Sequence, residues 1–355
     1  MASRVTPPAP YLVPLDTGFG QPFEHSLTFD ACFESGNLLR AVQRGPAEYD
    51  LFIRPDLHTE GHMQWFYFAV ANTHPPTRPA NAPAAVKFNV VNLTKPDSLF
   101  NQGMQPLLFS TGAAEREGAG WVRAGRDIAY YANPYLRGGS GNRDAGGGCT
   151  YFSLTFTLDF ASAGDTWLVT NSYPFTYSDH KYHLSRLLSS PFVRRHAAHS
   201  VLCTTLGNND CDLLTVTEDG KDEMPLGTGE DGNGGEDGGT GGSKKDKKRS
   251  ERSTASSSAT SSSASSVHPS RRKKCIVITG RVHPGETQAS WMMKGILDFL
   301  TGDSPQARLL RSLFVFKIVP MLNPDGVING NYRCSLAGCD LNRRWKFPSE
   351  ALHPT

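Results

Sequence analysis

Long apolar runs are missing from the sequence. No stretch approaches the roughly 20 residues of a membrane-spanning helix, and the N-terminal residues MASRVTPPAP lack the apolar core of a secretory signal. Net charge is nearly absent too, because 36 Lys and Arg residues balance 34 Asp and Glu residues to a formal +2. We therefore expect neither a nucleic-acid partner nor a membrane partner, and we expect a cytoplasmic protein.

A disulfide framework is lacking as well. The seven cysteines are an odd number, and they are scattered without a framework spacing. Cys334 and Cys339 lie close together, but no second pair accompanies them. This distribution is typical of reduced thiols in a reducing compartment, and it does not favour a small secreted domain.

The chain is long enough for two domains with hydrophobic cores, since it has 355 residues and 38% of them are apolar. Residues 1–20 are predicted to be a flexible leader. Residues 219–272 are rich in Gly, then Lys, then Ser, and we predict a disordered insert because they cannot bury enough apolar surface to offset the entropy of ordering. Between these segments we place an N-terminal domain over 21–177 and a second domain over 178–355, which contains the insert.

The first domain carries a strand pattern. The runs TFDACF, YDLFIRPD, QWFYFAVAN and AVKFNVVNL are each bounded by Gly, Pro, Asn or Asp. The clearest strand is 151–160, where Phe and Leu on one face alternate with mostly Ser, Thr and Asp on the other. This alternation predicts one buried and one solvated face, and the whole domain is predicted to be an antiparallel β-sandwich.

The second domain is expected to begin with an amphipathic helix over 178–188, followed by strands at 201–206 and 212–217. The apolar run 276–279 is typical of a fully buried parallel strand, and Thr287 can cap the helix that follows it. Another buried strand is predicted at 313–319. The histidine pairs 180/183 and 196/199 fall in helical patterns and are expected to be hydrogen-bonded or solvated, because no third ligand type accompanies either pair.

His283 and Glu286 lie in the turn between the strand 276–279 and the helix after it. In open α/β sheets, ligands bind at the loops that leave the carboxyl ends of strands. Imidazole and carboxylate are ligands of catalytic zinc, and Pro284 with Gly285 favours a tight turn that aims both side chains at one point. A His-x-x-Glu spacing alone is common, so a structural or solvent-exposed role is the alternative.

Further motifs follow the second strand in order: NPDG at 323–326, GNYR at 330–333 and DLNRRW at 340–345. Together with HPGE at 283–286, they resemble the zinc carboxypeptidases of the carboxypeptidase A class, and most closely their cytosolic branch. The runs PDLHTEGHMQWFYF, VNLTKPDSLFNQGMQPLLFS, WVRAGRDIAYYANP and YPFTYSDHKYHL resemble the β-sandwich domain that precedes the peptidase domain in this branch. The resemblance implies that 178–355 form an incomplete α/β zinc carboxypeptidase domain, with an α/β/α arrangement and a mixed sheet.

The resemblance also implies a role for five residues. His283 and Glu286 match the first two ligands of a Zn²⁺ ion, and Arg333 matches the arginine that polarises the scissile carbonyl and stabilises the oxyanion. Asn342 and Arg343 match the pair that binds the substrate's terminal carboxylate, for which a planar guanidinium is suited because it forms two parallel hydrogen bonds.

The activity implied by the resemblance is the removal of C-terminal glutamates from acidic, polyglutamylated protein tails such as those of tubulin, with an association with microtubules. The family's third ligand, a histidine, and its general-base glutamate lie beyond the arginine motif. We find no counterpart for them in residues 1–355, so we expect a truncated chain that is inactive alone.

Two alternatives remain open. One is a non-catalytic module that binds acidic tails, and the other is a related zinc amidohydrolase or deacylase, against which the N-terminal sandwich argues. For Arg344 and Trp345 the expectation is structural: a salt bridge and a packed aromatic ring.

Overall fold

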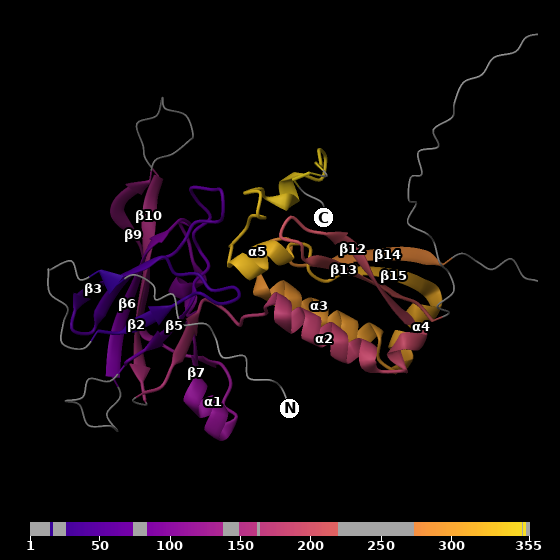
Figure 1. Ribbon diagram of the computed structural model, residues 1–355, viewed down its shortest axis with the longest axis horizontal. Coiled ribbons are helices and arrows are strands. Elements are labelled where there is room, and N and C mark those ends of the chain that lie inside the picture. The colour runs from indigo at the N-terminus through magenta and orange to yellow at the C-terminus, as the bar shows by residue number, and fades with distance from the viewer. Residues whose placement is uncertain are drawn as a thin grey trace, which may run out of the picture.

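The computed structural model describes residues 15–16, 26–73, 84–137, 149–161, 164–218, 273–349 and 351–352. Apart from residues 15–16, the predicted leader lies outside the described residues, and so does the whole predicted insert. Figure 1 shows a strand-rich part, coloured indigo to magenta, beside a smaller part in which helices pack on a sheet. Within the described residues, no helix is both long and apolar enough to cross a membrane.

The strand-rich part contains two sheets. The first has the order β1-β3-β4-β6-β10-β9, and the second has the order β2-β5-β11-β7-β8. The first sheet comprises β1 (Leu15–Asp16), β3 (Arg40–Gly45), β4 (Glu48–Phe52), β6 (Ala84–Leu93), β10 (Cys149–Phe160) and β9 (Arg126–Arg137). The second comprises β2 (Thr28–Asp30), β5 (Tyr67–Ala71), β11 (Trp167–Thr170), β7 (Leu107–Ser110) and β8 (Val122–Arg123), with the short helices η1 (Leu99–Gln102) and α1 (Thr111–Glu117) in connections.

Aromatic rings join the two sheets into a sandwich. Phe29 and Phe68 of the second sheet lie 6.4 and 6.1 Å from the ring of Phe88 in the first sheet. All three rings are buried, and rings of this size carry a large share of a core's apolar area. Most neighbouring strands are antiparallel, as predicted, but β1 pairs with β3 in parallel and so does β4 with β6. The chain passes through β5 of the other sheet between β4 and β6.

The predicted strand 151–160 is confirmed as part of β10, but its second face is less solvated than predicted. Ser153, Thr155 and Thr157 are each less than 10% exposed. The reason is that β10 lies between β6 and β9. Neighbouring side chains cover this face, and Thr155 bonds to both Asn89 and Tyr131.

The second part is a mixed sheet with the order β12-β13-β15-β14, in which β14 and β15 are parallel and the other pairs are antiparallel. Its strands are β12 (Ala197–Thr204), β13 (Asp210–Val216), β14 (Lys274–Thr279) and β15 (Phe314–Val319). Its helices are α2 (Tyr177–Ser189), η2 (Val193–Arg195), α3 (Thr287–Leu300), α4 (Pro305–Leu313), α5 (Pro324–Asn329) and η3 (Leu341–Arg343).

Helices α2 and α3 lie side by side on one face of this sheet (Figure 1). Their buried residues Leu184, Met293 and Leu297 form one core with Phe316 and Ile318 of β15. Side chains on one face recur every 3.6 residues in α3 and every second residue in β15. Each element therefore turns one apolar face towards the other. This packing fixes the N-terminus of α3 next to the carboxyl ends of β14 and β15.

Three local expectations were wrong. The strand at 276–279 is not fully buried, since β14 lies at the edge of the described sheet, helices cover only its Ile276 and Ile278 face, and Val277 is 67% exposed. Thr287 does not cap α3, because it is already inside the helix and its hydroxyl bonds to Ser172. His199 lies in β12 rather than in a helix, since pairing with β13 outweighs the local helical pattern.

The histidines of the two pairs are hydrogen-bonded, as predicted. His180 and His199 both contact Asp212, His183 contacts Asp298, and His196 contacts the carbonyl of Thr301.

Candidate active site

A buried arginine holds the turn between β14 and α3. Arg281 is 3% exposed and adopts a φ of 54°. Its guanidinium donates hydrogen bonds to the carbonyls of Pro284 (2.7 Å) and Phe175 (3.0 Å) and to the Ser290 hydroxyl (2.7 Å). Burial lowers the pKa of Arg281. The guanidinium therefore connects the turn to α3 and to the segment before α2.

The turn also contacts the two loops that follow β15. Gly285 donates its backbone N–H to the carbonyl of Tyr332 at 2.8 Å, and an added Cβ at this glycine would lie 2.5 Å from the Tyr332 ring. Only glycine permits so close an approach. Asn323, in the NPDG segment, donates to the carbonyl of Val282 at 3.2 Å. The HPGE, NPDG and GNYR segments are thus joined at one end of the sheet.

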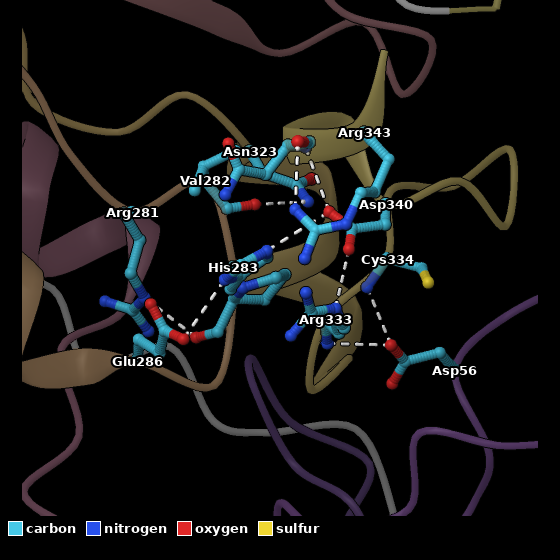
Figure 2. A network of polar contacts seen from close by, with 12 residues as sticks. Asp56, Arg281, Val282, His283, Glu286, Asn323, Arg333, Cys334, Asp340 and Arg343 are labelled. Carbon is cyan, nitrogen blue, oxygen red and sulfur yellow. Dashed lines mark hydrogen bonds and ion pairs between the residues drawn. The ribbon is translucent and has the colours of Figure 1, made fainter.

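His283 lies between two carboxylates (Figure 2). Its Nδ1 is 3.0 Å from Glu286 Oε1, and its Nε2 is 3.1 Å from Asp340 Oδ1. His283 is 7% exposed, so these contacts fix the orientation of its imidazole. Glu286 occupies the N-cap position of α3, where the helix dipole favours negative charge. The two predicted zinc ligands therefore converge on each other.

Arg333 joins the same network through Asp340. Its Nε donates to Asp340 Oδ2 at 2.6 Å. Burial alone would raise the pKa of Asp340, but the hydrogen bonds from Arg333 and His283 outweigh it and lower this pKa. Asp340 thus stays ionised and holds both the guanidinium and the imidazole.

Asn342 and Arg343 lie in η3, directly after Asp340, and both are exposed. The Asn342 backbone N–H donates to Asp340 Oδ1 at 2.9 Å, and its side-chain oxygen accepts from the Trp345 indole at 2.9 Å. The Arg343 guanidinium donates to the carbonyl of Asn342 at 3.1 Å, and it forms no ion pair with any described residue. Its charge is thus available to a ligand.

The expectations for Arg344 and Trp345 were wrong. Trp345 is 65% exposed instead of packed, and Arg344 contacts Cys339 Sγ at 4.0 Å without an ion pair to a described residue. Both follow a short 3₁₀ turn at the surface, and no described element covers them.

Two family models match the chain. Residues 202–353 match the zinc carboxypeptidase model, and residues 29–124 match the model of the cytosolic carboxypeptidase N-terminal domain. Cytosolic carboxypeptidase 1 of Danio rerio is 41% identical over 332 residues, and cytosolic carboxypeptidase 4 of Homo sapiens is 41% identical over 330. The chain belongs to the cytosolic carboxypeptidases.

Each alignment includes 93% of this chain but only 24% of the Danio rerio protein and 25% of the human one, so the chain spans about a quarter of the length of these relatives. A solved metallo-carboxypeptidase from Burkholderia cenocepacia shares the fold, with a TM-score of 0.58 and 21% identity. That alignment covers 93% of this chain and 65% of the solved one.

The residues present fit two ligands of a cytosolic carboxypeptidase zinc site. The facing atoms of His283 and Glu286 are 3.0 Å apart, and Asp340 occupies the other imidazole nitrogen, as a carboxylate commonly does behind a metal-binding histidine. Among the described residues, no group of three or more His, Cys, Asp or Glu side chains could hold a metal ion. The described site therefore offers two candidate ligands and a carboxylate that orients His283.

Sequence reasoning missed Asp340, although it opens the DLNRRW motif. The motif directed attention to Asn342 and Arg343, while the structure shows that the aspartate contacts both His283 and Arg333. The signal that could have identified it is chemical, since a zinc-binding histidine usually needs an acceptor for its second N–H.

Proposed function

We propose that this protein is a zinc-dependent metallocarboxypeptidase that removes glutamate residues from the C-terminal ends of acidic protein tails. The observation that carries the proposal is the convergence of His283 Nδ1 and Glu286 Oε1, with Asp340 on the opposite imidazole nitrogen. With Asp340 accepting from Nε2–H, the imidazole would present its Nδ1 lone pair to a metal ion beside the Glu286 carboxylate. An imidazole and a carboxylate are two of the three protein ligands that a catalytic zinc site commonly uses, which supports the proposal.

His283 and Glu286 would hold the ion, and Asp340 would keep the imidazole in the ligating tautomer. When bound, zinc supplies an activated water and polarises the scissile carbonyl. Arg281 would keep the turn rigid from behind, because its guanidinium bonds to the turn and to α3 at once. The metal is thus expected to find its ligands already oriented.

Arg333 would bind the carbonyl oxygen as negative charge develops on it. The Arg333–Asp340 pair uses only Nε, and the two terminal nitrogens have no hydrogen-bond partner among the described residues. A guanidinium oriented through one nitrogen can donate from the other two. Donors placed before the reaction towards developing charge make one of the largest contributions to catalysis.

Arg343 and Asn342 would bind the terminal carboxylate of the substrate. The exposed Arg343 carries no internal ion pair in the described part of the chain, so an incoming carboxylate would not have to displace one. Acidic, polyglutamylated tails, including those of tubulin, are the substrates we propose, with the cytoplasm and microtubules as the site of action. The match of residues 29–124 to the cytosolic carboxypeptidase N-terminal domain supports this branch over a deacylase.

The test is steady-state kinetics of the full-length, zinc-loaded protein on two peptides that end in glutamates, one as the free acid and one as the C-terminal amide. We expect cleavage of the acid only. The Arg343→Ala variant should raise KM about tenfold, or about 1.4 kcal/mol, with a smaller change in kcat. The neighbouring Arg344→Ala variant is the matched control and should change KM less.

Equal cleavage of the acid and the amide would contradict the carboxylate contact and favour the deacylase alternative. Tight binding of the free acid without any cleavage would favour the binding module.

A further inference from the structure

A carboxylate of the N-terminal sandwich reaches residues 332–334 of the second domain, the segment that carries Arg333 (the catalytic loop). Asp56 is 1% exposed and lies in the connection between β4 and β5. Its Oδ1 accepts the backbone N–H of Tyr332 at 2.6 Å, and its Oδ2 accepts those of Arg333 and Cys334 at 2.7 Å each. Figure 2 shows Asp56 approaching Arg333 and Cys334 from the side opposite His283.

The loop that carries Asp56 is closed on itself. The Asp56 N–H donates to the carbonyl of Gly61 at 3.2 Å, and the Thr59 hydroxyl donates to the Asp56 carbonyl at 2.8 Å. His58 and His62 adopt φ values of 56° and 59°, which let the chain turn tightly within a few residues. The carboxylate is therefore presented by a defined loop and not by a free side chain.

The Asp56 carboxylate accepts three backbone N–H groups, and all three belong to residues 332–334. No Lys, Arg or His of the described residues forms an ion pair with it. Burial raises the pKa of Asp56, and the three N–H donors oppose this shift. Three converging N–H groups need an acceptor that offers several lone pairs, which an ionised carboxylate provides.

The segment 332–334 contacts the turn that carries His283 and Glu286, and it also carries Arg333. The Tyr332 carbonyl accepts the N–H of Gly285, inside the turn that carries His283 and Glu286. The Arg333 side chain pairs with Asp340, which in turn contacts His283. One carboxylate thus fixes the backbone from which the guanidinium extends and on which the metal-ligand turn rests.

Other sandwich side chains support the same loop. Asn37 donates to the carbonyl of Gly330 at 3.1 Å, and the Lys95 ammonium lies 4.7 Å from the centre of the Tyr332 ring. These contacts flank the Asp56 contact, but neither touches Arg333. Asp56 is the described sandwich residue that bonds to the Arg333 backbone.

We propose that Asp56 is a positioning residue for catalysis, which sets the location of Arg333 relative to the HPGE turn from the other domain. If the Asp56 hydrogen bonds are lost, Arg333 is still present, but its guanidinium is displaced from its position in the active site. A displacement of about 1 Å can cost on the order of a hundredfold in rate. In its kinetic consequence this inference rests on the proposed peptidase function.

The experiment uses Asp56→Asn in the full-length, zinc-loaded protein, with Asp165→Asn as the matched control. Asp165 is also a buried sandwich carboxylate that accepts a backbone N–H, from Gly112 at 2.9 Å, but among the described residues it makes no hydrogen bond or ion pair with residues 332–334. We expect Asp56→Asn to lower kcat about ten- to a hundredfold with KM changed much less, and zinc content unchanged. Asp165→Asn should keep the wild-type kcat in its folded fraction.

Two further readouts separate positioning from simple stabilisation. Amide hydrogen exchange at Tyr332, Arg333 and Cys334 should be slow in the wild type and fast in Asp56→Asn, with the β10 amides unchanged. In an Arg333→Ala background, Asp56→Asn should lower kcat little further, because the group that it positions is gone. Independent, multiplying effects of the two substitutions would overturn the inference.

Other outcomes are equally decisive. A folded Asp56→Asn variant with the wild-type kcat would overturn the inference while leaving the proposed function intact. An inactive wild type would contradict the proposed function, whereas the exchange measurement would still test the anchor. If Asp56→Asn does not fold, wild-type exchange decides: rapid exchange at residues 332–334 would contradict the anchor, and strong protection would support it.

Discussion

The two halves of the molecule bury different kinds of side chain. In the sandwich, the rings of Phe66, Phe88 and Phe156 are fully buried, and Phe156 contacts both Phe88 on the neighbouring strand and Phe66. In the α/β half, arginine side chains are buried as well: Arg281 and Arg311 are 3% and 1% exposed, and both donate to backbone carbonyls. Apolar packing stabilises without direction, whereas a buried guanidinium fixes the chain segments to which it donates.

This difference predicts that core substitutions in the sandwich reduce stability, while polar substitutions at the strand ends of the α/β half reduce activity. Asp56 is the exception that connects the halves, since it belongs to the sandwich but bonds to the catalytic loop.

The largest effect on stability is expected from Phe156→Ala. The ring is fully buried and lies 6.2 Å from Phe66 and 5.7 Å from Phe88. Its removal should lower the free energy of unfolding by about 3 to 5 kcal/mol, and Phe156→Leu should cost less. Denaturant unfolding measures this loss, and kcat of the folded fraction should stay at the wild-type value. A strong loss of kcat with unchanged stability would contradict the expectation that core substitutions in the sandwich reduce stability and not activity.

Arg333→Ala should show the opposite pattern. The guanidinium is proposed to meet charge that develops only in the transition state, so kcat and kcat/KM should fall together by about a hundredfold or more. Stability should change little, since the side chain is partly exposed and forms one ion pair. Steady-state kinetics alongside thermal unfolding tests both statements. If Arg333→Ala mainly raises KM, Arg333 binds the substrate before the reaction and does not act on the transition state.

A smaller effect with a distinct pH signature is expected at Asp212, whose carboxylate bonds to His180, Lys181 and His199. Burial alone would raise the pKa of Asp212, but these hydrogen bonds lower it well below its ordinary range. The stabilisation is therefore present above the unfolded pKa of about 3.9 and is lost as pH falls towards the folded value.

Asp212→Asn should lower the free energy of unfolding by about 1.5 to 3 kcal/mol at neutral pH and by less in acid. Unfolding curves at several pH values measure the difference, with Asp210→Asn as the control, because the Asp210 side chain is about half exposed. An equal loss at every pH would show that the charge of Asp212 is not responsible.

Much of this arrangement could be predicted from local patterns. The strands of the sandwich, helix α2, strand β15 and the HPGE turn are all encoded within short segments by periodicity and turn residues. The predicted residues His283 and Glu286 contact each other, and Arg333 is connected to His283 through Asp340, because the carboxyl ends of the parallel strands β14 and β15 lie at one edge.

The missed features depend on contacts that are distant in sequence. Asp56 lies more than 270 residues from the backbone groups that it binds, and no local pattern connects them. The exposure of Val277 and the strand that contains His199 also depend on which neighbours a strand has, which the local pattern does not specify.

Metal analysis tests the central claim most directly, namely that His283 and Glu286 are zinc ligands of a peptidase. The full-length protein, His283→Ala and Glu286→Gln should be compared after dialysis against a weak chelator, with unfolding curves to confirm that each is folded. We predict about one tightly held zinc per chain in the wild type and a large loss in both variants, since three protein ligands are the usual number at a catalytic zinc. Full zinc retention in both folded variants would contradict the account.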